Sequence, residues 1–265
     1  IGIEPVLGLD PAAREGTRAV GPLTAAWYAL FMVPFFLWVR EVRPAAPLPV
    51  AQAARRALPD LLATLRGLPA RHPSLTAYLA SSMLYRDALN GMYVFGGIYA
   101  AGVLGWSVTD VGVFGILAVI TGAIFAWAGG FADDRFGPKR VIAAAVAVLA
   151  LVALAVTQVD RAAVFGVATG PESRLPDIAF YLLGATIGAA GGVLQSASRT
   201  MMVRQAIPGQ MTEGFGLYAL AGKATSFLAP FAIGITTDLT GSQQAGILPL
   251  VVLFALGLIL MIWVR

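Results

Sequence analysis

Seven long runs of mostly apolar residues are the feature that most constrains this chain. A membrane-spanning helix needs about 20 such residues, because the hydrocarbon layer is about 30 Å thick and each helical residue adds 1.5 Å. The runs are too long, and alternate too little between apolar and polar residues, to be strands of a membrane barrel. The sequence therefore predicts an all-α polytopic membrane protein with seven transmembrane helices, at residues 23–39, 74–104, 111–131, 141–159, 178–198, 214–237 and 246–264.

Composition agrees with this class and excludes several others. Hydrophobic residues make up 58% of the 265 residues and charged residues only 12%, whereas a soluble domain carries about 25% charged residues. An ordinary soluble enzyme, a disordered chain and a nucleic-acid binder with a basic patch are all excluded. With no Cys and a single His, His72 in a polar connector, we expect no metal site and no cofactor.

The positive charges predict the orientation of the chain. Of the 18 Lys and Arg residues, 12 fall in alternate connectors and the C-terminus, namely 40–73, 132–140, 199–210 and Arg265. The other connectors hold four, and Arg86 and Lys223 lie inside apolar runs. The cation-rich side of a membrane protein faces the cytoplasm. We therefore expect residues 1–22 to form an external loop and the C-terminus to be cytoplasmic.

The longest connector, 40–73, divides the chain into one span followed by six. In its middle, apolar residues such as Leu58, Leu62 and Leu65 recur at helical spacing, with Arg55 and Arg66 between them. An amphipathic helix lying on the anionic inner leaflet fits this pattern, and a solvated linker helix fits it as well. We expect Pro59 to kink or restart that helix.

A short charged link at 130–140 carries the most specific motif. Gly137 permits a tight turn, Pro138 suits the first position of the next helix, and two cations follow at the headgroup level. The pattern resembles the signature loop of the major facilitator superfamily, in which the acid precedes a basic residue and the loop gates the carrier. The matching positions are Gly130, Asp134, Arg135, Gly137, Lys139 and Arg140; Ala132 and Asp133 depart from it, and a second register makes Asp133 the signature acid.

Two further stretches resemble the vacuole-effluxer-like branch of that superfamily. Residues 214–230 are similar to its penultimate helix, and 85–90 to the first helix of its second half, with departures at Ala88 and Asn90. The resemblance implies that 23–39 is the last helix of an N-terminal half and 40–73 the central linker. It also implies that 74–265 is a C-terminal six-helix bundle and that the rest of the N-terminal half is missing. A bacterial inner membrane is the expected location.

Polar groups inside the apolar runs are the candidate site residues, because an ionisable group in hydrocarbon usually faces a cavity or a partner. Lys223 contacts either a substrate carboxylate or a coupling ion, or else forms a structural charge pair; an ion pair with Asp87 fits either role. Asp87 and Asn90 share one helix face. Gln195 could hydrogen-bond a solute. We place the substrate or proton path at Arg86, Asp87, Asn90, Gln195 and Lys223.

Secondary active transport is the function that these features predict. We expect a small polar solute, with amino acids among the candidates, to cross by alternating access coupled to protons, since no phosphate-binding loop for ATP is present. The expected partners are the lipid bilayer, the solute, H+ and the missing N-terminal half, and not a nucleic acid. A non-transporting membrane scaffold is the alternative, and a polytopic membrane enzyme is a third possibility that one His and no Cys disfavour.

Overall fold

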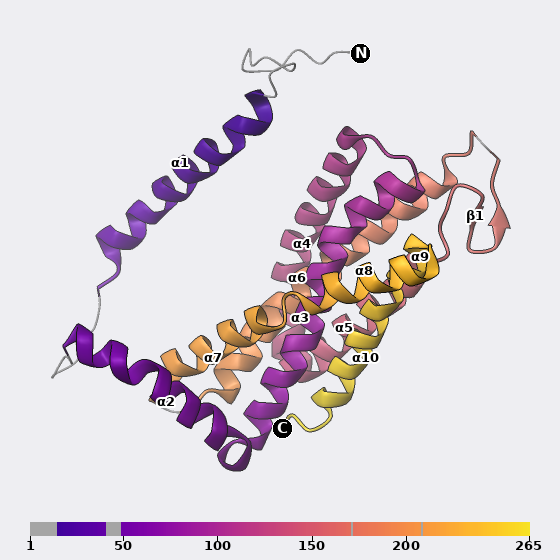
Figure 1. Cartoon of the computed structure of the whole chain (residues 1–265). Coiled ribbons are helices and arrows are strands. Elements are labelled where there is room, and N and C mark those ends of the chain that lie inside the picture. The colour runs from indigo at the N-terminus through magenta and orange to yellow at the C-terminus, as the bar shows by residue number, and fades with distance from the viewer. Residues whose placement is uncertain (1–14, 41–48, 171, 208) are drawn as a thin grey trace. The chain divides into compact units, whose positions relative to one another are not determined.

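The computed structural model describes residues 15–40, 49–170, 172–207 and 209–265, and is almost entirely helical (Figure 1). It divides into two units, residues 1–61 and 62–265, which are described separately. The helices are α1 (Glu15–Trp38), α2 (Val50–Arg71), α3 (Pro73–Val103), α4 (Val108–Phe136), α5 (Pro138–Val156), α6 (Leu175–Gln205), α7 (Met211–Ala224), α8 (Leu228–Thr240), α9 (Gln243–Gly246) and α10 (Leu248–Met261). Two short strands, β1 (Ala163–Val164) and β2 (Val167–Ala168), form a hairpin between α5 and α6.

Six stretches of the described residues are long and apolar enough to cross a membrane, so the chain is an integral membrane protein. The predicted count of seven is not confirmed, because α3 is a helix of 31 residues but is not among the six. Ser81, Ser82, Arg86 and Asp87 in its first half lower its mean hydropathy. The six stretches are Arg18–Trp38, Val108–Phe136, Pro138–Val156, Leu175–Gln205, Met211–Thr240 and Gln243–Met261.

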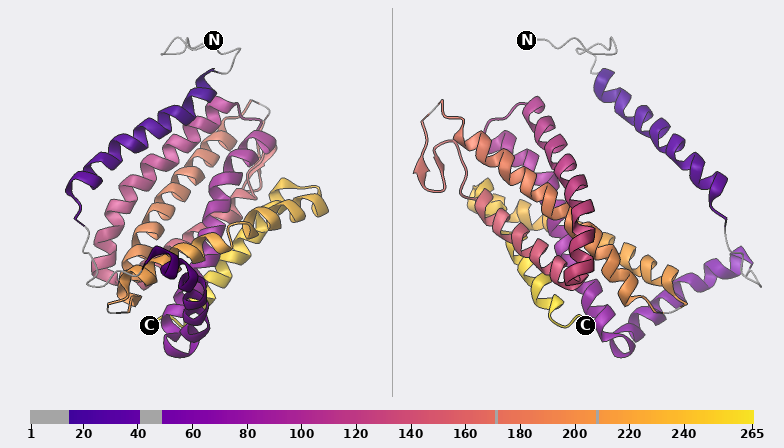
Figure 2. Two further views of the ribbon diagram at one scale, coloured as in Figure 1. Left: turned by 60° about the vertical axis from the view of Figure 1, so that its left-hand side comes forward. Right: turned by 180° about the vertical axis from the view of Figure 1, so that it is seen from behind.

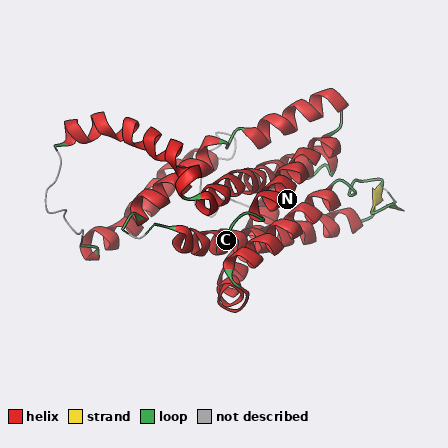
Figure 3. Ribbon diagram, turned by 90° about the horizontal axis from the view of Figure 1, so that it is seen from below, coloured by secondary structure: helices red, strands yellow, loops and turns green. Residues whose placement is uncertain are grey.

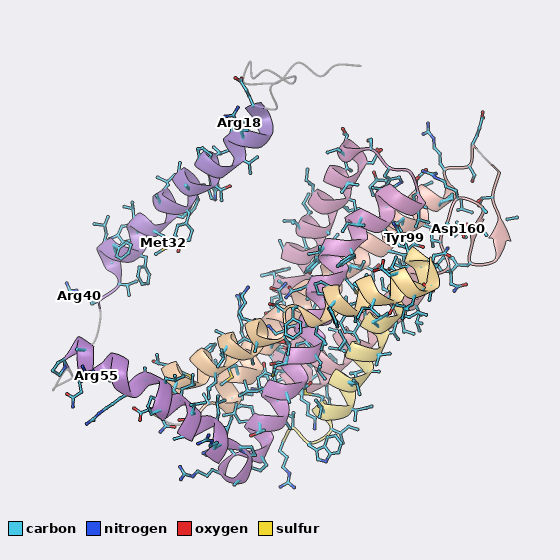
Figure 4. The ribbon with its side chains drawn as sticks, in the orientation of Figure 1. Arg18, Met32, Arg40, Arg55, Tyr99 and Asp160 are labelled. Atoms are coloured by element: carbon cyan, nitrogen blue, oxygen red, sulfur yellow. The ribbon has the colours of Figure 1, made fainter. Side chains whose placement is uncertain are left out.

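In the first unit, α1 is apolar on every side. None of the residues in its most apolar stretch is buried within the structure, and Trp27 and Trp38 are 63% and 77% exposed. Arg18 and Arg40 mark its two ends (Figure 4). A helix that is apolar all round and charged only at its ends is typical of a membrane span. The predicted linker helix is present as α2, which continues through Pro59 without a break.

The second unit is a bundle in which α4 and α6 lie side by side (Figure 2). The contact depends on Gly184, Gly188 and Gly192, spaced four residues apart on α6. A Cβ on Gly188 would meet the backbone of Ala118, and a Cβ on Gly192 the backbone of Gly122. Small residues let two helix backbones approach closely in a membrane. The three glycines therefore serve the packing of α4 against α6.

The predicted span at 214–237 is interrupted. Helix α7 ends at Ala224 and α8 begins at Leu228, with the intervening residues 225–227 in a turn. Pro230 accounts for the break, because it has no N–H to donate and its ring clashes with the carbonyl four residues earlier. Two half-helices therefore meet inside one membrane-spanning stretch, and turn hydrogen bonds such as that from Leu228 N–H to the Thr225 carbonyl join them.

The hairpin lies beyond the helix ends at one end of the bundle (Figure 3). Tyr99 and Asp160 lie at this end (Figure 4), where the Tyr99 hydroxyl donates to the carbonyls of Val156 and Val159. The Asp160 carboxylate accepts from the backbone of Ala162 and Ala163, and these bonds hold its pKa below the ordinary value. The connector from α5 to α6 is therefore anchored to α3.

Candidate functional site

Two adjacent residues of α3, Arg86 and Asp87, reach the broken helix from one side. Asp87 is 1% exposed, and its Oδ2 accepts a hydrogen bond of 2.8 Å from the backbone N–H of Ala229, in the first turn of α8. A helix N-terminus carries a partial positive charge and unpaired N–H groups, so a carboxylate is favourable there. Its other oxygen, Oδ1, is buried and has no hydrogen-bond partner among the described residues.

Arg86 makes the complementary contacts with α7. Its Nη1 donates to the backbone carbonyl of Tyr218 at 2.9 Å, and its guanidinium carbon lies 4.2 Å from the centre of the Tyr218 ring. A guanidinium in that position over an aromatic ring is attracted to it. The absence of a side chain at Gly222 makes room for this group. The pair therefore holds one half-helix with a cation and the other with an anion, on either side of the break.

We expect Gly222→Ala to displace Arg86, because the new Cβ would overlap the guanidinium. A guanidinium is the mobile end of a long side chain and will move, so the cost is its contacts with Tyr218, about 1–2 kcal/mol. Thermal unfolding of the purified protein would measure this loss. Gly216→Ala is the matched control on α7, since nothing lies within 4 Å of its Cβ position.

The double variant identifies the cause. If Arg86 is the affected group, Gly222→Ala adds no further loss of stability in an Arg86→Met background. An equal loss in both backgrounds, or the same melting temperature for Gly222→Ala and Gly216→Ala, would refute the assigned contact.

A buried group of tyrosines beside this pair was not identified from the sequence. Tyr78 and Tyr85 of α3 are fully buried; the Tyr78 hydroxyl donates to the backbone carbonyl of Ser198, and the Tyr85 hydroxyl lies 2.9 Å from the Ser198 hydroxyl. Tyr78 also stacks on Tyr218, with ring centres 6.1 Å apart. The group links α3, α6 and α7. Tyr78 and Tyr85 are seven residues apart and so share one face of α3, which is the sequence pattern that could have identified this group.

The structure separates Lys223 from Asp87. Both residues are described, and no ion pair joins them; the hypothesis of such a pair is wrong. Lys223 is exposed at the last turn of α7, where a cation is favourable for the helix dipole. Asn90 is exposed one turn beyond Asp87 and does not share its burial. Of the predicted path residues, Arg86 and Asp87 are thus brought to one place.

Gln195 lies instead in a groove of about 850 Å³ between α3, α4 and α6. Val111, Phe114 and Ala118 line part of it with apolar side chains. Its polar lining is Tyr93, Gln195, Ser196, Arg199 and Thr200. The groove offers hydrogen-bonding groups and one cation beside an apolar wall, which is the composition that small-molecule sites have.

In the signature loop, the two acids differ in their surroundings. Asp133 is 3% exposed, and Thr200 and Arg204 of α6 are its polar neighbours. Asp134 is exposed. Gly129, four residues before Asp133, is buried against Val193 of α6. Asp133, the signature acid in the second register, therefore faces the bundle. Asp134, the signature acid in the first register, faces outward.

The remaining signature residues lie around the turn between α4 and α5. Gly137 has φ of 81°, which favours glycine, and Gly130 has nothing within 4 Å of its Cβ position. The Lys139 ammonium donates to the carbonyls of Ile262 and Val264 at the end of α10, rather than pointing only to headgroups. Arg135 lies over the ring of Phe136, with 5.8 Å between guanidinium and ring centre, and Arg140 is exposed.

Comparison with known proteins covers nearly the whole chain. Residues 10–265 match the model of a family described as "Vacuole effluxer Atg22 like". The chain is 22% identical over 244 residues to the uncharacterized MFS-type transporter YxiO of Bacillus subtilis (strain 168), covering 91% of this chain and 52% of the relative. It is 24% identical over 267 residues to Autophagy-related protein 22 of Coccidioides immitis (strain RS), covering 92% of this chain and 42% of the relative. The chain thus spans about half the length of these relatives.

Proposed function

Since the chain belongs to the vacuole effluxer Atg22-like family, we propose that it forms the C-terminal half of a secondary active transporter. The family resemblance inferred from the motifs is confirmed. In this proposal, α3 to α10 are the six-helix bundle of a major-facilitator carrier and α1 is the last helix of the other half. The chain lies in a bacterial inner membrane, and its cation-rich connectors and C-terminus are on the cytoplasmic side.

One observation carries the proposal: a charged pair lies at a break within a membrane-spanning stretch. Transporters place substrate and ion sites at discontinuous helices, where half-helix ends present unpaired backbone groups. Arg86 and Asp87 occupy such a place, and Asp87 keeps one buried oxygen without a partner among the described residues. A buried carboxylate of this kind can take up and release a proton, so we assign the proton step to Asp87.

The groove lined by Tyr93, Gln195 and Arg199 supports the solute site of the same proposal. Its donors and single cation suit a small polar solute, amino acids included. Lys223, exposed at the end of α7, does not line this groove, and its role in solute binding rests on its position within a membrane-spanning stretch. Alternating access then requires the second half of the carrier to close over this face, with H+ as the coupling ion.

Flux into liposomes by the complete protein tests this proposal. We expect uptake or efflux of a small polar solute under an imposed proton gradient, and a marked fall in flux in Lys223→Ala and in Asp134→Asn. Asp133→Asn distinguishes the two registers of the signature loop. Unchanged flux in Lys223→Ala and in both acid variants would discard the assigned site and gate.

A further inference from the structure

A second groove lies on the other side of the contact between α4 and α6, between α4, α5 and α6. Its volume is about 760 Å³. The residues of α6 that line the two grooves, such as Gln195 and Ala189, lie about 120° apart around that helix at 100° per residue. The second groove thus lies on another face of α6 than the polar groove, and one of its ends is formed by Phe136 and Arg140 of the signature loop.

The shape of this groove follows from small residues on α6. Ala185 and Ala189 of α6 line it, together with Phe125 of α4 and Val148 of α5. Along α6 the lining extends from Leu182 to Val193, about 16 Å at 1.5 Å per residue. Along α4 it extends from Thr121 to Phe136, about 22 Å, so the groove is somewhat longer than one leaflet of the 30 Å hydrocarbon layer is deep.

The lining is apolar except at one end. The hydroxyls of Thr121 and Thr186 are bonded to carbonyls of their own helices. Arg140 is exposed at the end where α5 begins, and the structure gives its guanidinium no hydrogen bond or ion pair with the described residues. Arg135 lies over the ring of Phe136, which also lines the groove. An apolar groove thus ends at two cations.

We propose that this groove binds an anionic phospholipid of the cytoplasmic leaflet, one acyl chain in the groove and the headgroup phosphate on Arg140. Anionic headgroups are concentrated on that side of the membrane, and basic groups there attract them. The two cations at one end of the groove favour such a headgroup over the apolar face of another helix.

Lipid retention by the purified protein tests the site. The protein is stripped of lipid in detergent, mixed with phosphatidylglycerol or phosphatidylcholine of identical acyl chains, and examined by native mass spectrometry. We expect phosphatidylglycerol to be retained about fivefold better, the effect of one basic contact with an anionic headgroup. Arg140→Gln should reduce its retention to that of phosphatidylcholine, and Thr186→Phe should reduce the retention of both lipids by filling the groove.

Two matched variants control for general effects. Arg71→Gln removes an exposed cation of α2, and Val119→Phe adds a ring to the other groove; both should retain lipid as the unchanged protein does. Thr186 is exposed, so its replacement should leave helicity and melting temperature unchanged. Equal retention of the two lipids, or a preference that survives Arg140→Gln, would overturn the proposal. A dimer that Thr186→Phe dissociates without affecting lipid retention would assign the groove to a second copy and also overturn it.

Discussion

Gly188→Ala and Gly192→Ala are each expected to destabilise the protein by about 3 kcal/mol, at the upper end of the cost of overfilling a packed core. The added Cβ would lie 2.7 Å from the Cα of Ala118 in the first variant, and 2.8 Å from the carbonyl carbon of Gly122 in the second. Backbone atoms cannot rotate away as a side chain can. Helices α4 and α6 must therefore separate along their contact.

The measurement is the melting temperature of the purified protein, which such a cost should lower by about 6–12 °C in a chain of this size. Gly115→Ala on α4 is the control, because nothing lies within 4 Å of its Cβ position. A glycine replaced by alanine in an open helical position gains roughly 0.5–1 kcal/mol. Equal melting temperatures for Gly192→Ala and Gly115→Ala would show that α4 and α6 do not approach as closely as described.

Replacing Asp87 is expected to have the largest effect on transport. Asp87→Asn keeps an oxygen that can accept from the N–H of Ala229, so we expect a folded protein. It cannot release a proton, and solute movement driven by a proton gradient should fall to background. Asp87→Ala should in addition lose the contact with α8, at a cost of about 2 kcal/mol.

Three measurements separate the structural and the functional role of Asp87. Melting temperature should fall in Asp87→Ala and not in Asp87→Asn. Flux driven by a proton gradient should be lost in both. Solute exchange without a gradient should persist in Asp87→Asn, since that reaction needs no net proton movement. Gradient-driven flux at the unchanged level in Asp87→Asn would remove this residue from the proton step.

Much of the fold could be predicted because membrane helices leave a strong local signal. The length of the apolar runs located the helices, and the spacing of Gly184, Gly188 and Gly192 on α6 is a local pattern of the kind that favours close helix packing. The helices extend past the apolar runs by a few residues, as at α4 and α6, because polar residues continue a helix beyond the hydrocarbon. The predicted span at 74–104 is not confirmed because it corresponds to α3. Polar residues of α3 that face the bundle reduce the mean hydropathy of that helix.

The site could be predicted less completely, because burial depends on contacts between distant helices. The charges at Arg86 and Asp87 stood out against apolar neighbours, but their partners, Tyr218 and Ala229, were visible only in the fold. The motif matched Asp134, whereas Asp133 is the buried acid. A pattern of residue types does not say which of two adjacent side chains faces the bundle, since successive helical residues point about 100° apart.

The central claim is that this chain is half of an alternating-access transporter. Its most direct test is the accessibility, from each side of the membrane, of Asn90, which is exposed one turn from Asp87. The 265 residues contain no Cys, so Asn90→Cys introduces a single thiol among them. We predict that a membrane-impermeant thiol reagent labels it from either side, and that solute with an imposed gradient shifts labelling from one side to the other. Labelling from one side only, unchanged by solute and gradient, would contradict transport and favour a static scaffold.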